Sequence, residues 1–148
     1  MTEQEVKYFI DVVVNYFRDI SGEPSEMGIP FVKEKETMLL DYTGLIGISG
    51  AKKGAIYLTA SKEMLGEITS ILLGDDDPGE ELIVDMAGEI ANTIAGNVRE
   101  NFGASFMISV PIILKGCPDD VIIRMVPPIF IIPIKWRKHS AFLAVGLE

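Results

Sequence analysis

Apolar and polar residues alternate along the chain in a pattern that predicts three helices. In the first, from about Gln4 to Ile20, apolar side chains recur every three or four positions, and Ser21-Gly22 follows as a stop signal. A shorter helix is predicted over Lys62–Leu73. Ser61 is its cap and Gly74 its end, and the side chains expected to face inward are Met64, Leu65, Ile68, Ile71 and Leu72.

The longest helix is predicted between Asp77 and about Phe102. Asp77 is a favourable N-cap, Pro78 suits the first helical position, and acidic residues follow near the positive end of the helix dipole. At about 100° per residue, one broad arc of this helix is apolar and expected to be buried. It comprises Ile83, Val84, Ala87, Ile90, Ala91, Ile94, Ala95, Val98 and Phe102. The opposite arc carries Asp85, Glu89, Asn92, Gly96 and Arg99.

The remaining segments have the composition of strands and turns. Residues 23–30 read as a loop, residues 31–49 as two strands interrupted near 34–37, and Gly50–Gly54 as the turn into a strand over Ala55–Thr59. Further strands are predicted after the long helix, with a turn at 118–120: Met107–Leu114, Val121–Pro127, Ile129–Trp136 and Ala141–Gly146. Pro127-Pro128 predicts a bend, and Pro133 an edge position or another irregularity.

These elements predict an α+β fold for residues 1–148 as a single domain. Helices at the front and middle of the chain, with strands between and after them, indicate a largely antiparallel sheet against which a long central helix and two shorter helices pack. The length of 148 residues and a hydrophobic content of 48% suit one well-filled core.

Charge and composition exclude several classes of function. The net charge of -9 argues against nucleic-acid binding, which needs clustered lysines and arginines. The most apolar stretch, 121–136, is interrupted by an arginine and three prolines and is too short and broken to span a bilayer, so no membrane contact is expected. The acidic, polar N-terminus does not resemble a signal peptide, and the single cysteine, Cys117, permits no internal disulfide; a cytoplasmic location is therefore expected.

The chain offers little sign of a self-contained active site. His139 lies in a charged turn and is expected to be exposed, and Cys117 has no base nearby in the sequence. Asp75-Asp76-Asp77 does not have the spacing of a calcium loop and is expected to be a solvated tip that caps a helix. No metal site and no bound cofactor are therefore predicted for this chain.

Glu89 and Asn92 are the candidate functional pair. They lie three residues apart and are neighbours on the polar arc of the long helix, with Gly96 one turn further on. An interior glycine costs a helix roughly 1 kcal/mol relative to alanine, so Gly96 requires an explanation such as the close approach of another molecule. From the pattern alone, the simpler interpretation of the polar arc is the solvated side of an amphipathic helix.

The residues around this pair resemble a known family. Gly88-Glu89-Ile90-Ala91-Asn92-Thr93-Ile94-Ala95-Gly96-Asn97 resembles the active helix of the CheC/CheX/FliY family of chemotaxis phosphatases, and most of all its CheX branch. The glycine-turned hairpin over 46–57 and the segment 109–116 resemble the corresponding parts of the family, in the same order. The first helix offers Asp11 and Asn15 but no Glu-x-x-Asn, and so lacks the second active centre of the CheC branch.

The resemblance implies that the chain dephosphorylates a CheY-type response regulator. Glu89 would pair with a lysine of the regulator and Asn92 would orient the attacking water, while magnesium would belong to the regulator. Gly88 and Gly96 would provide clearance, although helix packing also explains a glycine. Asp85 and Arg99 would be further contacts, although exposed charges need no such role.

The resemblance also implies a homodimer formed by joining sheets, with the apolar C-terminal strands expected to supply the edge. The alternative function is a non-catalytic binding or assembly module of a chemotaxis or flagellar signalling complex.

Overall fold

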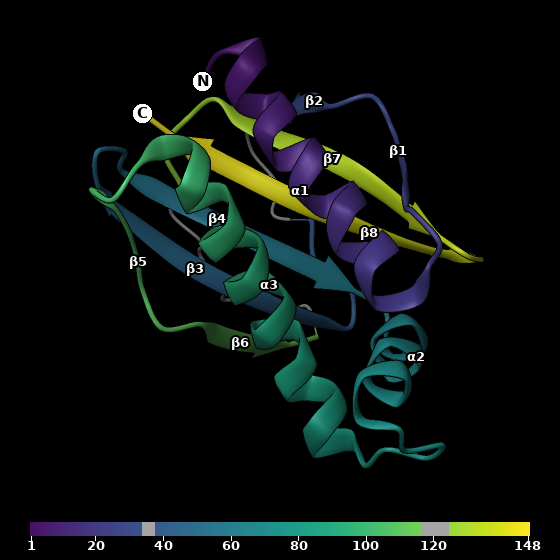
Figure 1. Ribbon diagram of the computed structural model, residues 1–148. Helices are drawn as coiled ribbons and strands as arrows, with labels where there is room; N and C mark the ends of the chain where they lie inside the picture. Colours follow the sequence, from purple (N-terminus) through teal and green to yellow (C-terminus); the bar gives the residue numbers. More distant parts are fainter. Residues whose placement is uncertain (34–37, 117–124) are drawn as a thin grey trace.

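The computed structural model describes residues 1–33, 38–116 and 125–148, whose helices and strands are arranged as two layers (Figure 1). The helices α1 and α3 cross one face of a twisted sheet and run antiparallel to each other. The third helix, α2, lies where α1 ends and α3 begins. None of the helices in the described ranges is long and apolar enough to cross a membrane.

The helix α1 spans Glu3–Ser21, as predicted, and local chemistry fixes both of its ends. The Thr2 hydroxyl accepts a hydrogen bond from the Glu5 amide at 3.1 Å, and the Glu5 carboxylate accepts one from the Thr2 amide at 2.9 Å. This reciprocal pair satisfies amides that have no partner within the helix. Gly22 ends the helix in the left-handed region, with φ 76°.

The helix α2 spans Lys62–Leu73 between Ser61 and Gly74, also as predicted. Met64, Leu65 and Ile68 are buried, but Ile71 and Leu72 are exposed, so the inward direction predicted for these two was wrong. Ile71 and Leu72 lie in the last turn of α2. This turn begins the exposed segment 71–77 and is not covered by the elements that pack on the first two turns.

The long helix α3 spans Glu80–Phe102 and begins later than predicted. Its N-cap is Gly79, which makes no side-chain capping hydrogen bond, so the prediction that Asp77 caps the helix was wrong. The Asp77 amide instead donates to the Asp75 carboxylate at 3.0 Å, a local turn that competes with helix formation. The first turn is held by the Tyr42 hydroxyl, which donates to the Glu80 carboxylate at 2.8 Å.

The buried face of α3 agrees with the predicted arc but is wider. Met86 and Gly88 are also buried, whereas Phe102 is half-buried. The face is wider because α3 contacts more than the centre of the sheet. It also packs against the other two helices and against the short strands that follow it in the chain.

The centre of the sheet consists of two antiparallel hairpins. β3 (Tyr42–Gly50) turns into β4 (Gly54–Ala60), and β7 (Ile129–Trp136) turns into β8 (His139–Leu147). β4 pairs with β8 along its whole length, from Gly54 with Leu147 to Ala60 with Ala141. Every described strand pair is antiparallel, which confirms the predicted α+β class with a largely antiparallel sheet.

Short strands flank this centre on both sides. β1 (Glu26–Met27) and β2 (Phe31–Lys33) pair with β7, while β5 (Phe106–Ile108) and β6 (Ile112–Lys115) pair with β3. β7 and β8 therefore lie inside the described sheet, whereas β5 and β6, which belong to the same strand-rich C-terminal part, lie at one of its sides. β8 is interior because it pairs with its hairpin neighbour β7 on one side and with β4, a strand distant in the sequence, on the other.

Prolines explain two departures from the predicted strands. The segment predicted as one strand over Met107–Leu114 is split around Ser109–Pro111, where Pro111 lacks an amide and the Ser109 hydroxyl accepts from the Gly47 amide at 2.8 Å. Pro133 lies in β7 opposite the gap between β1 and β2, which is the predicted irregularity. β1 itself lies within the predicted loop.

Pro127-Pro128 forms a bend, as predicted, and is followed directly by β7. The predicted interruption at 34–37, the turn at 118–120, residues 121–124 of a predicted strand, and Cys117 lie outside the described residues.

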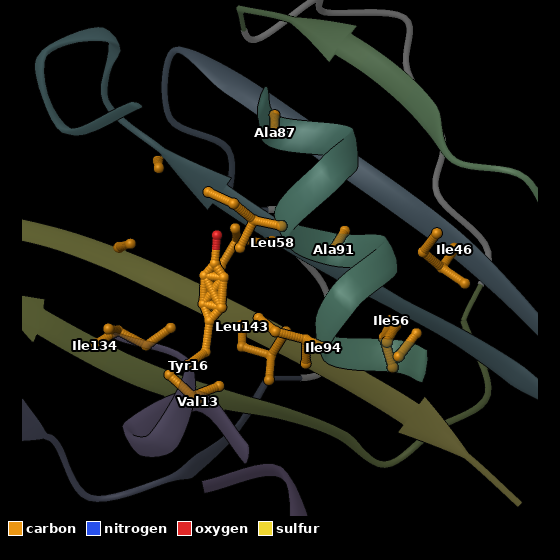
Figure 2. Close-up of a cluster of buried hydrophobic side chains, with 14 of the residues drawn as sticks. Val13, Tyr16, Ile46, Ile56, Leu58, Ala87, Ala91, Ile94, Ile134 and Leu143 are labelled. Atoms are coloured by element: carbon orange, nitrogen blue, oxygen red, sulfur yellow. The ribbon is translucent and has the colours of Figure 1, made fainter. Parts of the chain in front are cut away.

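The main core lies between the helices and the sheet (Figure 2). Ala87, Ala91 and Ile94 of α3 face Ile46, Ile56, Leu58 and Leu143 of the sheet, and α1 adds Val13 and Tyr16. The opposite face of the sheet carries a smaller cluster around Tyr57, Ile131 and Ala144.

His139 is buried, so its predicted exposure was wrong. The turn between β7 and β8 is so short that the first residue of β8 lies against α2, where His139 Nε2 is 2.9 Å from the Glu67 carboxylate. The hydrogen bond with His139, together with one from Arg137, lowers the pKa of Glu67 below its usual 4.5. His139 thus has a structural partner that joins the sheet to α2.

Candidate functional site

Glu89 and Asn92 stand next to each other on the outer face of α3. Both are exposed, while Gly88, Ile90 and Ala91 beside them are buried. Neither the Glu89 nor the Asn92 side chain makes a hydrogen bond or ion pair with any residue in the described part of the chain. The backbone of the pair is therefore fixed by the core, and the two polar groups are available to another molecule.

Close backbone packing sets the position of α3 on the sheet. A side chain at Gly44 of β3 would collide with the carbonyl group of Ala87. A Cβ at Gly88 would lie 3.2 Å from Ile113 Cδ1 and 3.3 Å from Pro111 Cβ. Since Gly88 precedes Glu89 directly, contacts on two sides of this turn determine which way Glu89 and Asn92 point.

Gly88 is explained by this packing, because it is buried against Pro111 and Ile113. Its role as clearance for a partner remains a prediction.

Asp85 lies one turn before Glu89 and is exposed. It borders a shallow hollow of about 540 Å³ that also includes Glu80, Glu81, Ile113 and Lys115. The acidic line of α3 therefore continues from Glu89 toward the start of the helix.

Gly96 lies one turn beyond Asn92, beside open space. No atom lies within 4 Å of the position that a Cβ would occupy, so no packing within the described residues requires a glycine. The hollow of about 420 Å³ at this point is bordered by Arg99, Glu100 and Ala104. Arg99 is exposed, and its guanidinium donates to the Ala104 carbonyl at 2.8 Å, which ties the chain after α3 to the helix.

Tyr16 of α1 is a polar neighbour that the sequence did not single out. Its side chain is 7% exposed, and its hydroxyl has no hydrogen-bond partner among the described residues. Burial, and secondarily the negative charge of Glu89, raise the pKa of Tyr16 to about 12. The hydroxyl is therefore a protonated donor in the electric field of Glu89. Helical periodicity predicted the burial of Tyr16 but carries no information about which residue of α3 lies near its hydroxyl.

The site contains acceptors and donors rather than a nucleophile. A carboxylate accepts hydrogen bonds and pairs with cations, and a carboxamide both donates and accepts. The described residues hold no group of three or more histidine, cysteine, aspartate or glutamate side chains placed to bind a metal ion. The chemistry that this arrangement offers is the positioning of groups supplied by another molecule.

Solved structures with this fold define the class of protein. A CheX chemotaxis protein from Desulfovibrio desulfuricans is 26% identical, with a TM-score of 0.84 and coverage of 98% of this chain and 99% of that one. CheX from Vibrio vulnificus is 25% identical, with a TM-score of 0.82 and coverage of 98% and 99%. A CheX from Borrelia burgdorferi, solved in a complex with CheY, BeF3 and magnesium, has the same fold at 20% identity, with a TM-score of 0.79 and 97% of each chain covered. The fold is that of the CheX and CheC-like chemotaxis proteins.

The family follows from the sequence itself. The family model described as "Chemotaxis phosphatase CheX" matches residues 42–131, which is more than half of the chain. The chain belongs to the CheX family of chemotaxis phosphatases, which confirms the resemblance found in the sequence. A search of curated proteins finds no significant match.

Proposed function

We propose that the protein hydrolyses the aspartyl phosphate of a CheY-type response regulator through Glu89 and Asn92. The observation that carries the proposal is that an exposed carboxylate and an exposed carboxamide, neither bonded to another described side chain, are neighbours on a helix that packs closely against the sheet. Membership of the CheX family and the Borrelia burgdorferi complex with CheY support the choice of partner.

In this proposal the regulator supplies the phosphoryl group, the magnesium ion and a lysine. The Glu89 carboxylate accepts hydrogen bonds from that lysine and so fixes the regulator relative to α3. The Asn92 carboxamide accepts a hydrogen bond from a water molecule and holds it in line with the phosphorus. Phosphoryl transfer depends largely on positioning and charge stabilisation, so two correctly placed side chains are enough to accelerate it.

The Asn92→Ala variant tests this role. We expect regulator dephosphorylation to slow by ~10²-fold or more, because the water is no longer oriented. We expect the free energy of unfolding to change by no more than about 0.5 kcal/mol, because the site is an exposed helical position. The lifetime of the phosphorylated regulator, measured with and without each variant, gives the rate.

Gln4→Ala is the matched control, because it removes a carboxamide from an exposed position of α1. The Glu89→Gln variant removes the charge proposed to pair with the regulator's lysine, and Glu63→Gln, at an exposed position of α2, is its matched control. Normal turnover by Asn92→Ala would refute the proposal. Binding of the regulator by the wild-type protein without faster phosphate loss would instead support the assembly module.

We also propose that the protein forms a homodimer in the cytoplasm. β2 and β6 lie at the two sides of the described sheet, and each is near exposed apolar residues: Phe31 and Val32 on one side, Val110 and Ile112 on the other. An exposed strand with apolar side chains favours pairing with a second chain.

A further inference from the structure

The face of the molecule beside Glu89 includes a polar groove between α1 and α3. The groove has a volume of about 280 Å³, and its polar lining includes Asp11, Asn15, Tyr16 and Asp19 of α1 with Asn97 and Glu100 of α3. We call this surface the α1–α3 groove. None of the described residues that line it is a lysine or an arginine. The groove is therefore negatively charged, with three carboxylates from two helices.

The carboxylates of the groove have no partners. Asp11, Asp19 and Glu100 make no hydrogen bond or ion pair with any described residue. They do not converge on a point, since Asp11 and Asp19 lie eight residues apart, or about 12 Å along the helix axis. The described residues include no cluster suited to a metal ion. This spacing suits the separate cationic side chains of a protein surface better than one bound cation.

Tyr16 gives an independent indication of a ligand. Its side chain is more than nine-tenths buried, lines the groove, and keeps a hydroxyl without a partner in the described ranges. The hydroxyl oxygen itself is accessible from the surface, since none of the buried side-chain nitrogens and oxygens in the described ranges lacks a partner, so it is available to donate to a ligand that enters the groove. The same hydroxyl lies in the field of Glu89, which shows that the groove adjoins the candidate site.

We propose that the α1–α3 groove is the docking surface for lysine or arginine side chains of the phosphorylated regulator. This inference rests on the proposed function, because it places the regulator over Glu89 and Asn92. The contact area of Glu89 and Asn92 is far smaller than the roughly 800 Å² that each partner buries in a specific interface. The regulator must therefore also cover neighbouring surface. The groove is an adjoining surface that combines three carboxylates with a hydroxyl donor that has no partner in the described ranges. Opposite charges beside the site accelerate the encounter and orient the regulator before Glu89 and Asn92 act.

The test compares two triple variants of the whole protein with the same change of charge. The groove variant carries Asp11→Asn, Asp19→Asn and Glu100→Gln. The tip variant carries Asp75→Asn, Asp76→Asn and Asp77→Asn in the exposed segment before α3. The probes are the phosphorylated regulator for KM and kcat, and the regulator with bound beryllofluoride and magnesium for Kd.

We expect the groove variant to raise KM and Kd about tenfold at low salt with kcat unchanged, and the difference to shrink as ionic strength rises. The tip variant should change KM and Kd less than twofold. Tyr16→Phe should weaken binding severalfold while leaving the midpoint of urea unfolding in place. Equal effects of the two triple variants, or a lower kcat at unchanged KM in the groove variant, would overturn the proposal.

The outcomes also separate this inference from the proposed function. If the wild-type protein binds the loaded regulator without shortening the phosphate lifetime, the phosphatase proposal fails and the Kd comparison still decides the groove. If turnover is fast and the groove variant is normal in KM and Kd, the groove proposal alone fails. No binding by the wild-type protein would overturn both.

Discussion

Gly96 is a half-buried glycine in the middle of α3, and a glycine in the interior of a helix costs about 1 kcal/mol relative to alanine. At Gly96 this cost is not offset by packing among the described residues, because a Cβ there would meet no atom within 4 Å. Gly96 lies one turn from Asn92 on the same face. Clearance for a partner at this turn of the helix, predicted from the sequence, stays a prediction.

Gly96→Ala should therefore raise the free energy of unfolding by about 0.5–1 kcal/mol and slow regulator dephosphorylation. Urea unfolding and the lifetime of the phosphorylated regulator measure the two effects. Gly66→Ala is the matched control within α2, where a Cβ would lie at an ordinary 3.7 Å from Ile83 Cδ1. The control should gain stability without losing activity, and equal activity of the two variants would remove the need for clearance at Gly96.

For single residues, the sequence predicted well which face of its own helix a side chain occupies. It predicted poorly which residues of different elements contact each other. Glu89 and Asn92 were predicted as neighbours on an exposed face because helical geometry alone relates positions three apart. His139 was predicted as exposed because its neighbours in the sequence are charged, yet its partner is Glu67 of α2. Tyr16 was recognised only as a core residue, because nothing local connects it with Glu89.

At the level of elements, the close contact between β3 and α3 positions the candidate site. Gly44 allows the carbonyl of Ala87 to approach the strand, and alanines at 87, 91 and 95 keep the helix low on the sheet. The helix has no side-chain N-cap, so its first turn depends on the contact between Tyr42 and Glu80. β3 thus contacts α3 at two places about two turns apart, and the contact at Ala87 lies next to the turn that carries Glu89.

Gly44→Ala should destabilise the protein by about 1–3 kcal/mol, because the added methyl group must displace a backbone carbonyl. It should also reduce phosphatase activity in the molecules that stay folded, because α3 must shift. Gly47→Ala in the same strand is the control, since its Cβ would lie 3.4 Å from the Ser109 hydroxyl oxygen and needs little movement. Chemical denaturation compares the two, and similar stability would contradict a close helix–strand contact at Gly44.

The ends and interruptions of elements were the least predictable features. α1 and α2 begin and end as expected because Thr2, Ser61, Gly22 and Gly74 are local signals. The start of α3 was placed too early, because Asp75 and Asp77 form a turn with each other instead of a cap. The split between β5 and β6 depends on the contact of Ser109 with Gly47, a residue more than sixty positions away.

For the whole molecule, the pairing of β4 with β8 determines which strands lie at the sides of the described sheet. It joins a hairpin from the first half of the chain to one from the end, and so places both inside the sheet. The α+β class followed from the order of elements, but this long-range pairing did not. The described sheet therefore has β1 and β2 at one side and β5 and β6 at the other, with β7 and β8 inside.

The homodimer is tested by sedimentation at micromolar concentration, where the wild-type protein should be dimeric. Val32→Lys in β2 or Ile112→Lys in β6 should produce monomers, depending on which edge is used, because a charge opposes strand pairing. Ile71→Lys, an equally drastic change at an exposed position of α2, should remain dimeric. A monomeric wild-type protein would refute the homodimer, and two dimeric edge variants would exclude pairing through these strands.

Because Glu89 and Asn92 protrude from the exposed side of α3, small-molecule inhibition should be difficult at this point. Drug-sized compounds gain affinity when most of their surface is enclosed, and a protruding pair of side chains encloses little. A helical or miniprotein binder that covers several turns of α3 together is the more promising kind of antagonist.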